Sequence, residues 1–306
     1  MAVKKLTICL ALCALFCARE SFAQTSLKTV RLNGAELHYI EEGKGVAVIF
    51  VHGGLDDYRV WQPQIEPFSQ RYRAISYSRR YNYPNAQLSR RNNYSPIVDA
   101  DDLAALIRKL NLGTAHIVGV SYGANVALFL AARHPQLVRS LVLSEPPVMR
   151  WLLEMPGGKS LYDEFMTKVW EPAARGFREG DTAGIKAAVD GFGELGYSGS
   201  DQQMTFATLP PEVRSLLLEN APEWRALTIS KDAFPDLPLS AIRRIKAPTL
   251  LLSGERSLRL HGMIDSRLER LLSRKERIIL PKATHEMWNE YPEECRRAAL
   301  AFFAKH

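Results

Sequence analysis

Short runs of β-branched and apolar residues, separated by helical patterns, constrain the fold of this chain more than any other feature of its sequence. Continuous apolar runs are typical of strands that are buried on both faces of a sheet. They occupy residues 46–51, 115–120, 140–144, 249–252 and 277–280, and apolar residues at helical spacing occupy 95–110, 124–133 and 293–304. This alternation predicts an α/β protein with a mostly parallel, doubly wound sheet and helices on both faces.

Additional strands are predicted at the amino-terminal side of this sheet. Residues 29–32 and 37–42 flank Asn33-Gly34, a dipeptide that is typical of a tight hairpin turn. Residues 73–77 form a further predicted strand.

Residues 147–245 interrupt the alternation. This interval contains helical patterns, several prolines and many large apolar side chains. We expect it to be a helical cap inserted between strands six and seven, which would create an apolar pocket over the strand ends. Trp151 of the cap and Leu55 of the core are predicted to bind substrate. The predicted organisation is a signal peptide (1–23), a first core part (24–146), the cap (147–245) and a second core part (246–306).

The first residues resemble a secretory signal peptide. Lys4 and Lys5 precede an apolar run over residues 6–18, and Ser21-Phe22-Ala23 places small residues at the positions that signal peptidase reads. Thirteen residues span only about 20 Å as a helix, which is too short for the bilayer core. We therefore expect cleavage, a periplasmic or secreted protein and no membrane span afterwards. A protein that keeps residues 1–23 as an anchor is the alternative.

Charge and cysteine content limit the possible partners. The net charge of +7 is spread along the chain without a basic stripe, so no nucleic-acid partner is expected. Signal cleavage would leave Cys295 as the single cysteine, which cannot form an internal disulfide and is expected to be buried. No His/Cys cluster has zinc-ligand spacing, and no metal site is predicted.

The motif with the greatest chemical content is Gly119-Val120-Ser121-Tyr122-Gly123. An apolar strand precedes it and a helix rich in small residues follows it, as in a nucleophile elbow. The glycines would allow strand and helix to approach closely, and the tight turn would expose the hydroxyl of Ser121. Since a serine hydroxyl needs an adjacent base, we assign that role to His285, which follows the last predicted strand.

Backbone N–H groups must also stabilise the oxyanion of an acyl-transfer intermediate. Tyr122 of the elbow is predicted to supply one. Gly54 is predicted to supply the other, because glycines after the strand at 46–51 let the backbone approach a ligand. His52 of the same loop is expected to brace it.

These motifs occur in an order that resembles the α/β-hydrolase superfamily. The resemblance rests on His52-Gly53-Gly54, Trp61, the elbow at 119–123, His134-Pro135 and Ala283-Thr284-His285. It extends over nearly all the chain after the signal segment and implies a hydrolase with a lid at the position of the predicted cap. In most relatives an Asp lies three residues after the glycine that ends strand seven.

Ser257 occupies that slot in this sequence, so the acid of the triad must lie elsewhere. Some relatives, haloalkane dehalogenases among them, place it after strand six, where this chain has Glu145 before two prolines. The prolines favour an extended backbone that would hold the carboxylate at the strand tip. We assign Glu145 as the acid, with Asp265 and Glu255 as alternatives. The role of the loop at 79–85, which replaces the usual Asp-x-x-Gly-x-Ser, is left open.

The predicted function is hydrolysis of a small carboxylic ester or related acyl substrate through Ser121, His285 and Glu145, without a cofactor. The same residues could support enol-lactonase, carbon–carbon hydrolase or perhydrolase chemistry. Dehalogenase and epoxide hydrolase are disfavoured, because their families use Asp in place of Ser121. A small-ligand receptor without turnover is the alternative from a different class.

Overall fold

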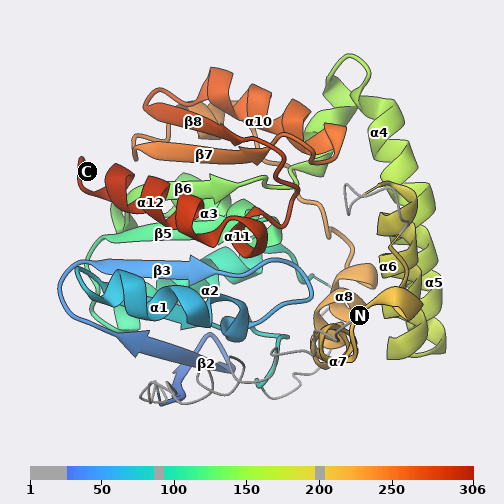
Figure 1. The fold of residues 1–306 in the computed structure, drawn as a ribbon, viewed down its shortest axis with the longest axis horizontal. Coiled ribbons are helices and arrows are strands. Elements are labelled where there is room, and N and C mark those ends of the chain that lie inside the picture. The colour runs from blue at the N-terminus through green and yellow to red at the C-terminus, as the bar shows by residue number, and fades with distance from the viewer. Residues whose placement is uncertain (1–25, 86–92, 197–203) are drawn as a thin grey trace, which may run out of the picture.

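The protein is described by a computed structural model over residues 26–85, 93–196 and 204–306, so the predicted signal peptide lies outside the described residues. Within these ranges one eight-stranded sheet forms the centre of the molecule (Figure 1). Its strands in chain order are β1 (Lys28–Leu32), β2 (Ala35–Glu42), β3 (Ala47–Val51), β4 (Arg73–Tyr77), β5 (Ala115–Val120), β6 (Val138–Ser144), β7 (Thr249–Gly254) and β8 (Lys275–Leu280).

The order of the strands across the sheet is β1-β2-β4-β3-β5-β6-β7-β8. β1 and β2 form the predicted hairpin, with Leu32 paired to Ala35, and β2 runs antiparallel to β4. From β4 to β8 all neighbours are parallel. Because parallel strands end at the same edge, the loops after β3, β5, β6 and β8 meet there.

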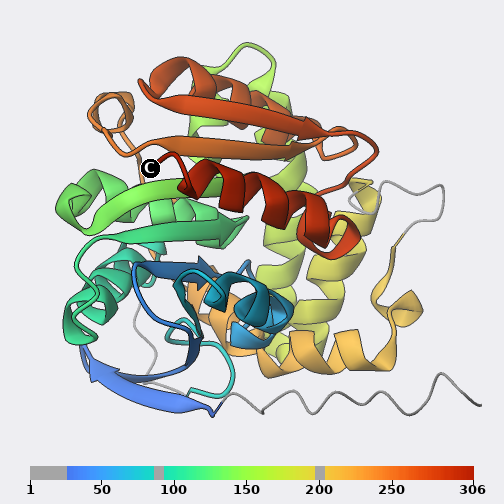
Figure 2. The same ribbon diagram turned by 60° about the vertical axis from the view of Figure 1, so that its left-hand side comes forward.

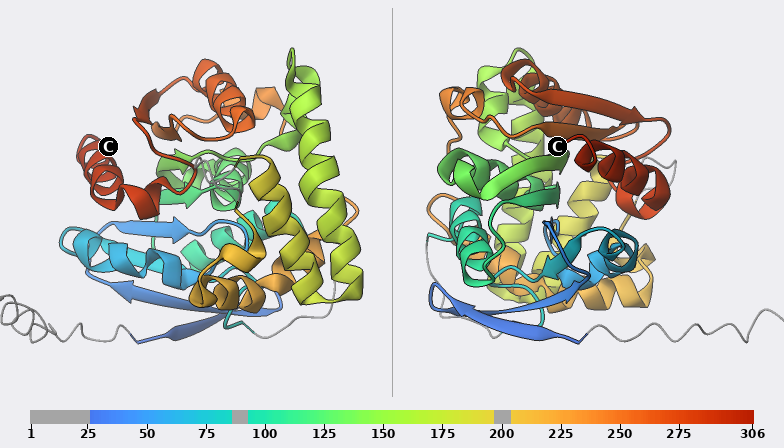
Figure 3. Two further views of the ribbon diagram at one scale, coloured as in Figure 1. Left: turned by 45° about the vertical axis from the view of Figure 1, so that its right-hand side comes forward. Right: turned by 90° about the vertical axis from the view of Figure 1, so that its left-hand side faces the viewer.

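Helices cover both faces of the sheet, as Figure 2 and the right panel of Figure 3 show. On one face lie α2 (Pro96–Lys109), α3 (Tyr122–Arg133) and α10 (Arg259–Leu271), and on the other lie α1 (Gln62–Ser69) and α12 (Pro292–Phe303). Strand side chains alternate between the two cores. In β3, Ile49 faces the first core and Phe50 the second; in β6, Leu141 faces the first and Val142 the second. The continuous apolar runs of the sequence thus reflect burial on both faces.

Between β6 and β7 the chain forms the inserted helices, a name used here for the helical elements from η3 to α9. They are η3 (Met149–Glu154), α4 (Gly158–Phe165), η4 (Met166–Trp170), α5 (Glu171–Glu179), α6 (Asp181–Glu194), η5 (Phe206–Thr208), α7 (Pro211–Glu219), α8 (Ala221–Thr228) and α9 (Leu239–Arg243). Several of them stand beside the strand ends (Figure 3, left). Large aromatic side chains hold this layer together, among them Trp170 and Trp224, whose ring centroids are 5.6 Å apart.

The structure confirms the predicted fold class and all eight strands, with ends that differ by at most three residues. Helices α1 and α10 were not predicted. α1 contains two prolines, Pro63 in its first turn and Pro67 inside it, which weaken its helical pattern. The remaining short helices are η1 (Tyr58–Trp61), η2 (Pro135–Leu137) and α11 (Met287–Glu290).

The environment of Cys295 and the lengths of the helices relate to the expected buried cysteine and to membrane spans. Cys295 is buried, and burial raises the pKa of its thiol to about 12. No helix within the described ranges is both long and apolar enough to cross a membrane.

Candidate active site

Ser121 lies in a sharp turn between β5 and α3. Its backbone has φ 53° and ψ −124°, a conformation that L-residues rarely adopt and that costs on the order of 1–3 kcal/mol. The Ser121 amide donates to the carbonyl of Ser144 at 2.8 Å, which ties the turn to the end of β6. The strand-turn-helix geometry predicted for this motif is therefore present.

The two glycines of the motif are required by close contacts. A Cβ atom on Gly123 would lie 2.2 Å from the carbonyl oxygen of Val51 and 2.4 Å from that of His52. A Cβ on Gly119 would lie 2.7 Å from the carbonyl oxygen of Gly123. Only a residue without a side chain allows α3 to start so close to β3 and β5.

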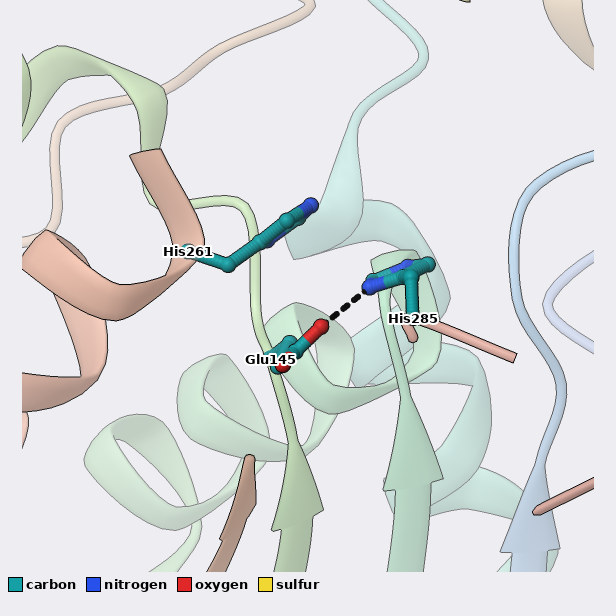
Figure 4. A group of neighbouring side chains, drawn as sticks. All are labelled: Glu145, His261 and His285. Atoms are coloured by element: carbon teal, nitrogen blue, oxygen red, sulfur yellow. Dashed lines mark hydrogen bonds and ion pairs between the residues drawn. The ribbon is translucent and has the colours of Figure 1, made fainter. Parts of the chain in front are cut away.

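His285 and Glu145 lie within hydrogen-bonding distance of each other. The His285 Nδ1 and Glu145 Oε2 atoms are 2.6 Å apart, and both residues are buried (Figure 4). The other carboxylate oxygen, Oε1, accepts a 2.7 Å hydrogen bond from the Gly254 amide. Glu145 thus holds the imidazole from the tip of β6 while its own position is fixed by the end of β7. Its backbone has φ 51°, so the extended conformation predicted from the two prolines was wrong.

This pair changes the pKa of both groups. Burial would raise the pKa of Glu145, but the hydrogen bond with His285 and the charge of that imidazole lower it below its usual value. Burial would lower the pKa of His285, but the hydrogen bond with Glu145 and its charge raise it. The arrangement favours an ionised carboxylate and stabilises positive charge on the imidazole.

The two alternative acids have other partners. Asp265 accepts a 2.6 Å hydrogen bond from Ser253, and burial raises its pKa to about 7. Glu255 accepts from the Lys282 amide at 2.8 Å. Ser257, which occupies the usual slot of the acid, has a buried hydroxyl without a hydrogen-bond partner among the described residues.

A second imidazole, which sequence reasoning did not single out, packs on His285. The His261 ring comes from α10 and stacks on His285 with centroids 4.3 Å apart and planes 19° apart (Figure 4). Burial and the charge of His285 lower the pKa of His261 to about 3, so this ring stays neutral. The apolar spacing of Leu260, Ile264 and Leu268 could have revealed the helix, but not the stacking.

Glu145, His261 and His285 offer three potential metal-ligand atoms within 4.8 Å of one another. The Glu145 and His285 atoms already bind each other, and the two rings lie in nearly parallel planes, so their nitrogen lone pairs do not converge on one point. This geometry suits a carboxylate-imidazole pair rather than a metal centre.

The loop after β3 contains the predicted oxyanion donor, Gly54. Tyr122 Cβ lies 3.9 Å from the place where a Gly54 Cβ would stand, so the two predicted donors are neighbours. His52 braces the loop, since its Nδ1 lies 2.9 Å from the Gly53 carbonyl and its Nε2 accepts from the Arg79 amide at 3.1 Å. The next amide, that of Leu55, donates to Glu223 Oε2 at 2.6 Å.

Arg79 explains the unusual loop after β4. Its guanidinium is fully buried and donates to the Gly53 carbonyl at 2.7 Å, to Glu223 at 2.6 Å and to Asp99 at 3.1 Å. It also lies over the Tyr122 ring, 4.4 Å from its centroid. Arg79 and Glu223 together join the loop after β3 to α8 of the inserted helices. The sequence held no signal for this pairing, because the two residues are 144 positions apart.

Two chambers meet at Ser121. The larger has a volume of about 560 Å³ and the smaller about 130 Å³. Both are lined by Gly54, Leu55, Ser121, Phe192 and His285. The larger volume is within the roughly 300–1,000 Å³ that is typical of small-molecule sites. Leu55, a predicted substrate contact, thus lies in the wall of both chambers together with Ser121.

Trp151, the other predicted substrate contact, lines neither chamber. Its side chain is 1% exposed, and its indole N–H donates to the Leu237 carbonyl at 2.8 Å. The assignment of Trp151 to the substrate site was wrong, because its side chain is buried within the inserted helices. The Phe, Trp and Tyr residues that do line the smaller chamber are Tyr122, Phe165, Trp170, Phe192, Trp224 and Phe234.

Comparison with known proteins shows that this chain is similar to hydrolases. A family model described as "alpha/beta hydrolase fold" matches residues 46–287. The chain is 26% identical over 283 residues to a 2-(acetamidomethylene)succinate hydrolase of Mesorhizobium japonicum, covering 90% of this chain and 94% of the relative. It is 28% identical over 124 residues to an uncharacterized hydrolase, YraK, of Bacillus subtilis, where the match spans 40% of this chain and about half (46%) of the relative. The solved enol-lactonase of Burkholderia xenovorans LB400 has the same fold, with a TM-score of 0.70 and 19% identity over 90% of this chain and 100% of the other.

Proposed function

Because the chain belongs to the alpha/beta hydrolase fold family, we propose that it is a serine hydrolase that cleaves a small carboxylic ester or related acyl substrate. The observation that carries this proposal is the buried 2.6 Å contact between His285 and Glu145, at the edge of a cavity that Ser121 also lines. The full-length relative named as a hydrolase supports the reaction class.

In the proposed mechanism Ser121 Oγ attacks the carbonyl carbon of the substrate. Since Nδ1 of His285 contacts Glu145, Nε2 is the nitrogen that takes the serine proton. The alcohol then leaves with that proton, and an acyl-enzyme remains. Water, deprotonated by the same nitrogen, attacks the acyl carbon. The carboxylic acid then leaves, and His285 returns the proton to Ser121 Oγ. Glu145 keeps the required tautomer and stabilises the imidazolium.

The oxyanion of each tetrahedral intermediate would be bound by the amides of Tyr122 and Gly54. Tyr122 is the first residue of α3, and amides in the first turn of a helix lack a partner within the helix. Since the Leu55 amide already donates to Glu223, Gly54 is the better candidate in the loop after β3. Loss of one such donor typically reduces kcat by about 100- to 1000-fold.

The inserted helices are proposed to act as the cap, residues 147–245, over this site. Phe192 of α6 and Leu216 of α7 line the larger chamber, and Trp224 of α8 lines the smaller one. In this proposal the helices shape both chambers, so they determine which acyl and alcohol groups fit.

The test is covalent labelling combined with turnover. A fluorophosphonate should label the wild type and fail to label Ser121→Ala, and the variant should lose hydrolysis of short aryl esters. Ser160→Ala, an exposed serine in α4, is the matched control and should behave as wild type. Labelling that persists in Ser121→Ala would exclude Ser121 as the nucleophile, and ligand binding without turnover would favour a receptor.

We propose separately, from residues 1–23 alone, that the protein is exported from the cytoplasm. Expression of the full chain in a bacterial host should yield a periplasmic product that begins at Gln24. Amino-terminal sequencing of that product decides between cleavage and a retained anchor.

A further inference from the structure

The larger chamber is acidic. Asp56, Glu286 and Glu290 contribute carboxylates to its lining, and none of its described lining residues is Lys or Arg. The smaller chamber has no Asp, Glu, Lys or Arg among its described lining residues. A substrate that occupies both chambers therefore meets negative charge on one side of Ser121 and an uncharged surface on the other.

We infer that this site takes acyl substrates without negative charge and discriminates against esters that carry a carboxylate. The inference concerns the cavity of the proposed hydrolase, so it rests on the proposed function. It names the substrate class by charge and separates this site from the relative of Mesorhizobium japonicum, whose name gives a succinate, a carboxylate-bearing substrate.

The three acidic residues lie on the two segments that also carry the predicted oxyanion donor and His285. Asp56 follows Leu55, whose amide is fixed by Glu223. Glu286 is next to His285 in the chain. The two oxygens of Glu290 accept from the amide and hydroxyl of Thr284, at 2.8 and 2.7 Å. The negative charge of the larger chamber therefore comes from Glu286 and Glu290, which line the same cavity as Ser121.

The effect of this charge is visible on neighbouring groups. Burial and then the charges of Glu286 and Glu223 raise the pKa of Asp56 well above its usual value. Glu286 also contributes to the raised pKa of His285, after the larger effect of Glu145. A bound carboxylate would experience the same repulsion as Asp56.

Nearby cations are already paired. The Arg79 guanidinium, behind the oxyanion loop, is buried against Glu223 and Asp99. Arg59 forms ion pairs with Asp57 at 2.7 Å and Glu219 at 2.5 Å. A carboxylate on the substrate would therefore lose hydration in the cavity without gaining a Lys or Arg partner among the described lining residues, which is unfavourable.

The smaller chamber excludes charge by its composition. Phe165, Trp170 and Phe234 pack against one another, with ring centroids 4.6 to 6.5 Å apart, and Phe192 and Trp224 extend the cluster. Such a surface can accept an apolar group or a cation over a ring face, but it repels an anion from the ring face.

The experiment compares uncharged, anionic and cationic aryl esters of similar size. In one series the charge is on the leaving group, as in phenyl acetates with a 4-carboxylate or a 4-trimethylammonium group. In the second it is on the acyl chain, as in monophenyl succinate against phenyl butyrate. Each kcat/KM is divided by the hydroxide-catalysed rate of the same ester, which removes differences in intrinsic reactivity.

We expect the normalised kcat/KM of anionic esters to be at least about tenfold below that of the uncharged esters, and cationic esters to equal or exceed them. The difference should narrow as salt approaches 1 M, where the Debye length is about 3 Å. Glu286→Gln should raise the relative rate of the anionic esters several-fold. Glu276→Gln makes the same charge change on β8, where Glu276 pairs with Lys305, and should leave the ratio unchanged.

Equal normalised rates for anionic and uncharged esters would overturn the inference and leave the hydrolase function intact. Absence of both labelling at Ser121 and turnover of every ester would instead overturn the proposed function, and the inference with it. The two failures are therefore distinguishable in one set of measurements.

Discussion

Replacement of Glu145 by Gln tests the proposed triad most directly. The change keeps the shape of the side chain and can keep the acceptor for the Gly254 amide, but it removes the charge beside His285. A glutamine amide facing Nδ1 would also favour the wrong tautomer, with the proton on Nε2, which then cannot accept a proton from Ser121.

The magnitude follows from the geometry. A hydrogen bond of 2.6 Å between Nδ1 and Oε2 places the centres of the two charges about 4 Å apart. At an effective dielectric constant near 20, two unit charges at that distance interact by about 4 kcal/mol. Because each 1.4 kcal/mol is about tenfold in rate, loss of this interaction corresponds to about a thousandfold. The tautomer effect adds to this, and the expected loss in kcat is therefore about 10³- to 10⁴-fold.

The assay is steady-state hydrolysis of a short aryl ester, with circular dichroism to verify folding. Asp265→Asn and Glu255→Gln are the matched controls, because they are the alternative acids. Each should reduce kcat less than tenfold, since Asp265 binds Ser253 and Glu255 binds the Lys282 amide. A larger loss in either control than in Glu145→Gln would refute the assignment.

Three further predictions concern pH, the buried ion pair and the nucleophile elbow. Since the base must be neutral and the pKa of His285 is raised, kcat/KM should fall as pH drops through a midpoint above about 6.5, and Glu145→Gln should move the midpoint in pH-rate profiles to lower pH. Glu223→Gln removes one partner of buried Arg79 and should lower the free energy of unfolding by about 3 kcal/mol in urea titrations, whereas a loss below 1 kcal/mol would contradict a structural role for the pair. Gly123→Ala should destabilise the protein by several kcal/mol, because the added Cβ would overlap two backbone carbonyls. The control Gly262→Ala lies in α10 with open space around it and should raise the melting temperature slightly. Equal melting temperatures of the two variants would disprove the contact argument.

Local sequence patterns were sufficient for the sheet and the elbow. Strands such as β3 and β6 are apolar along their whole length because both faces are covered, and the Gly119–Gly123 motif encodes its own tight turn. The proximity of Glu145 and His285 could be predicted because both follow parallel strands, which end at the same edge of the sheet.

Contacts between distant segments could not be predicted in this way. Glu223 bonds to Arg79 and to the Leu55 amide only because α8 packs over the loop after β3, and no periodicity in either segment indicates that packing. The stacking of His261 on His285 depends on how α10 leaves β7. Trp151 was misassigned for the same reason. An aromatic residue in a helical insertion has the same local sequence pattern whether its side chain faces the cavity or the core.

The anchoring of α8 has a consequence for how ligands enter. Movement of this helix away from the core would leave the guanidinium of Arg79 buried without Glu223, at a cost of several kcal/mol, and each 1.4 kcal/mol lowers the open population about tenfold. The solvent-exposed lining of the larger chamber comes instead from Val213 in α7 and from Glu286, Asn289 and Glu290 at α11. In this structure the larger chamber meets solvent between those two helices, so ligands can enter there while α8 keeps its ion pair with Arg79. The side chains that border this opening would then limit which molecules arrive and how quickly products depart.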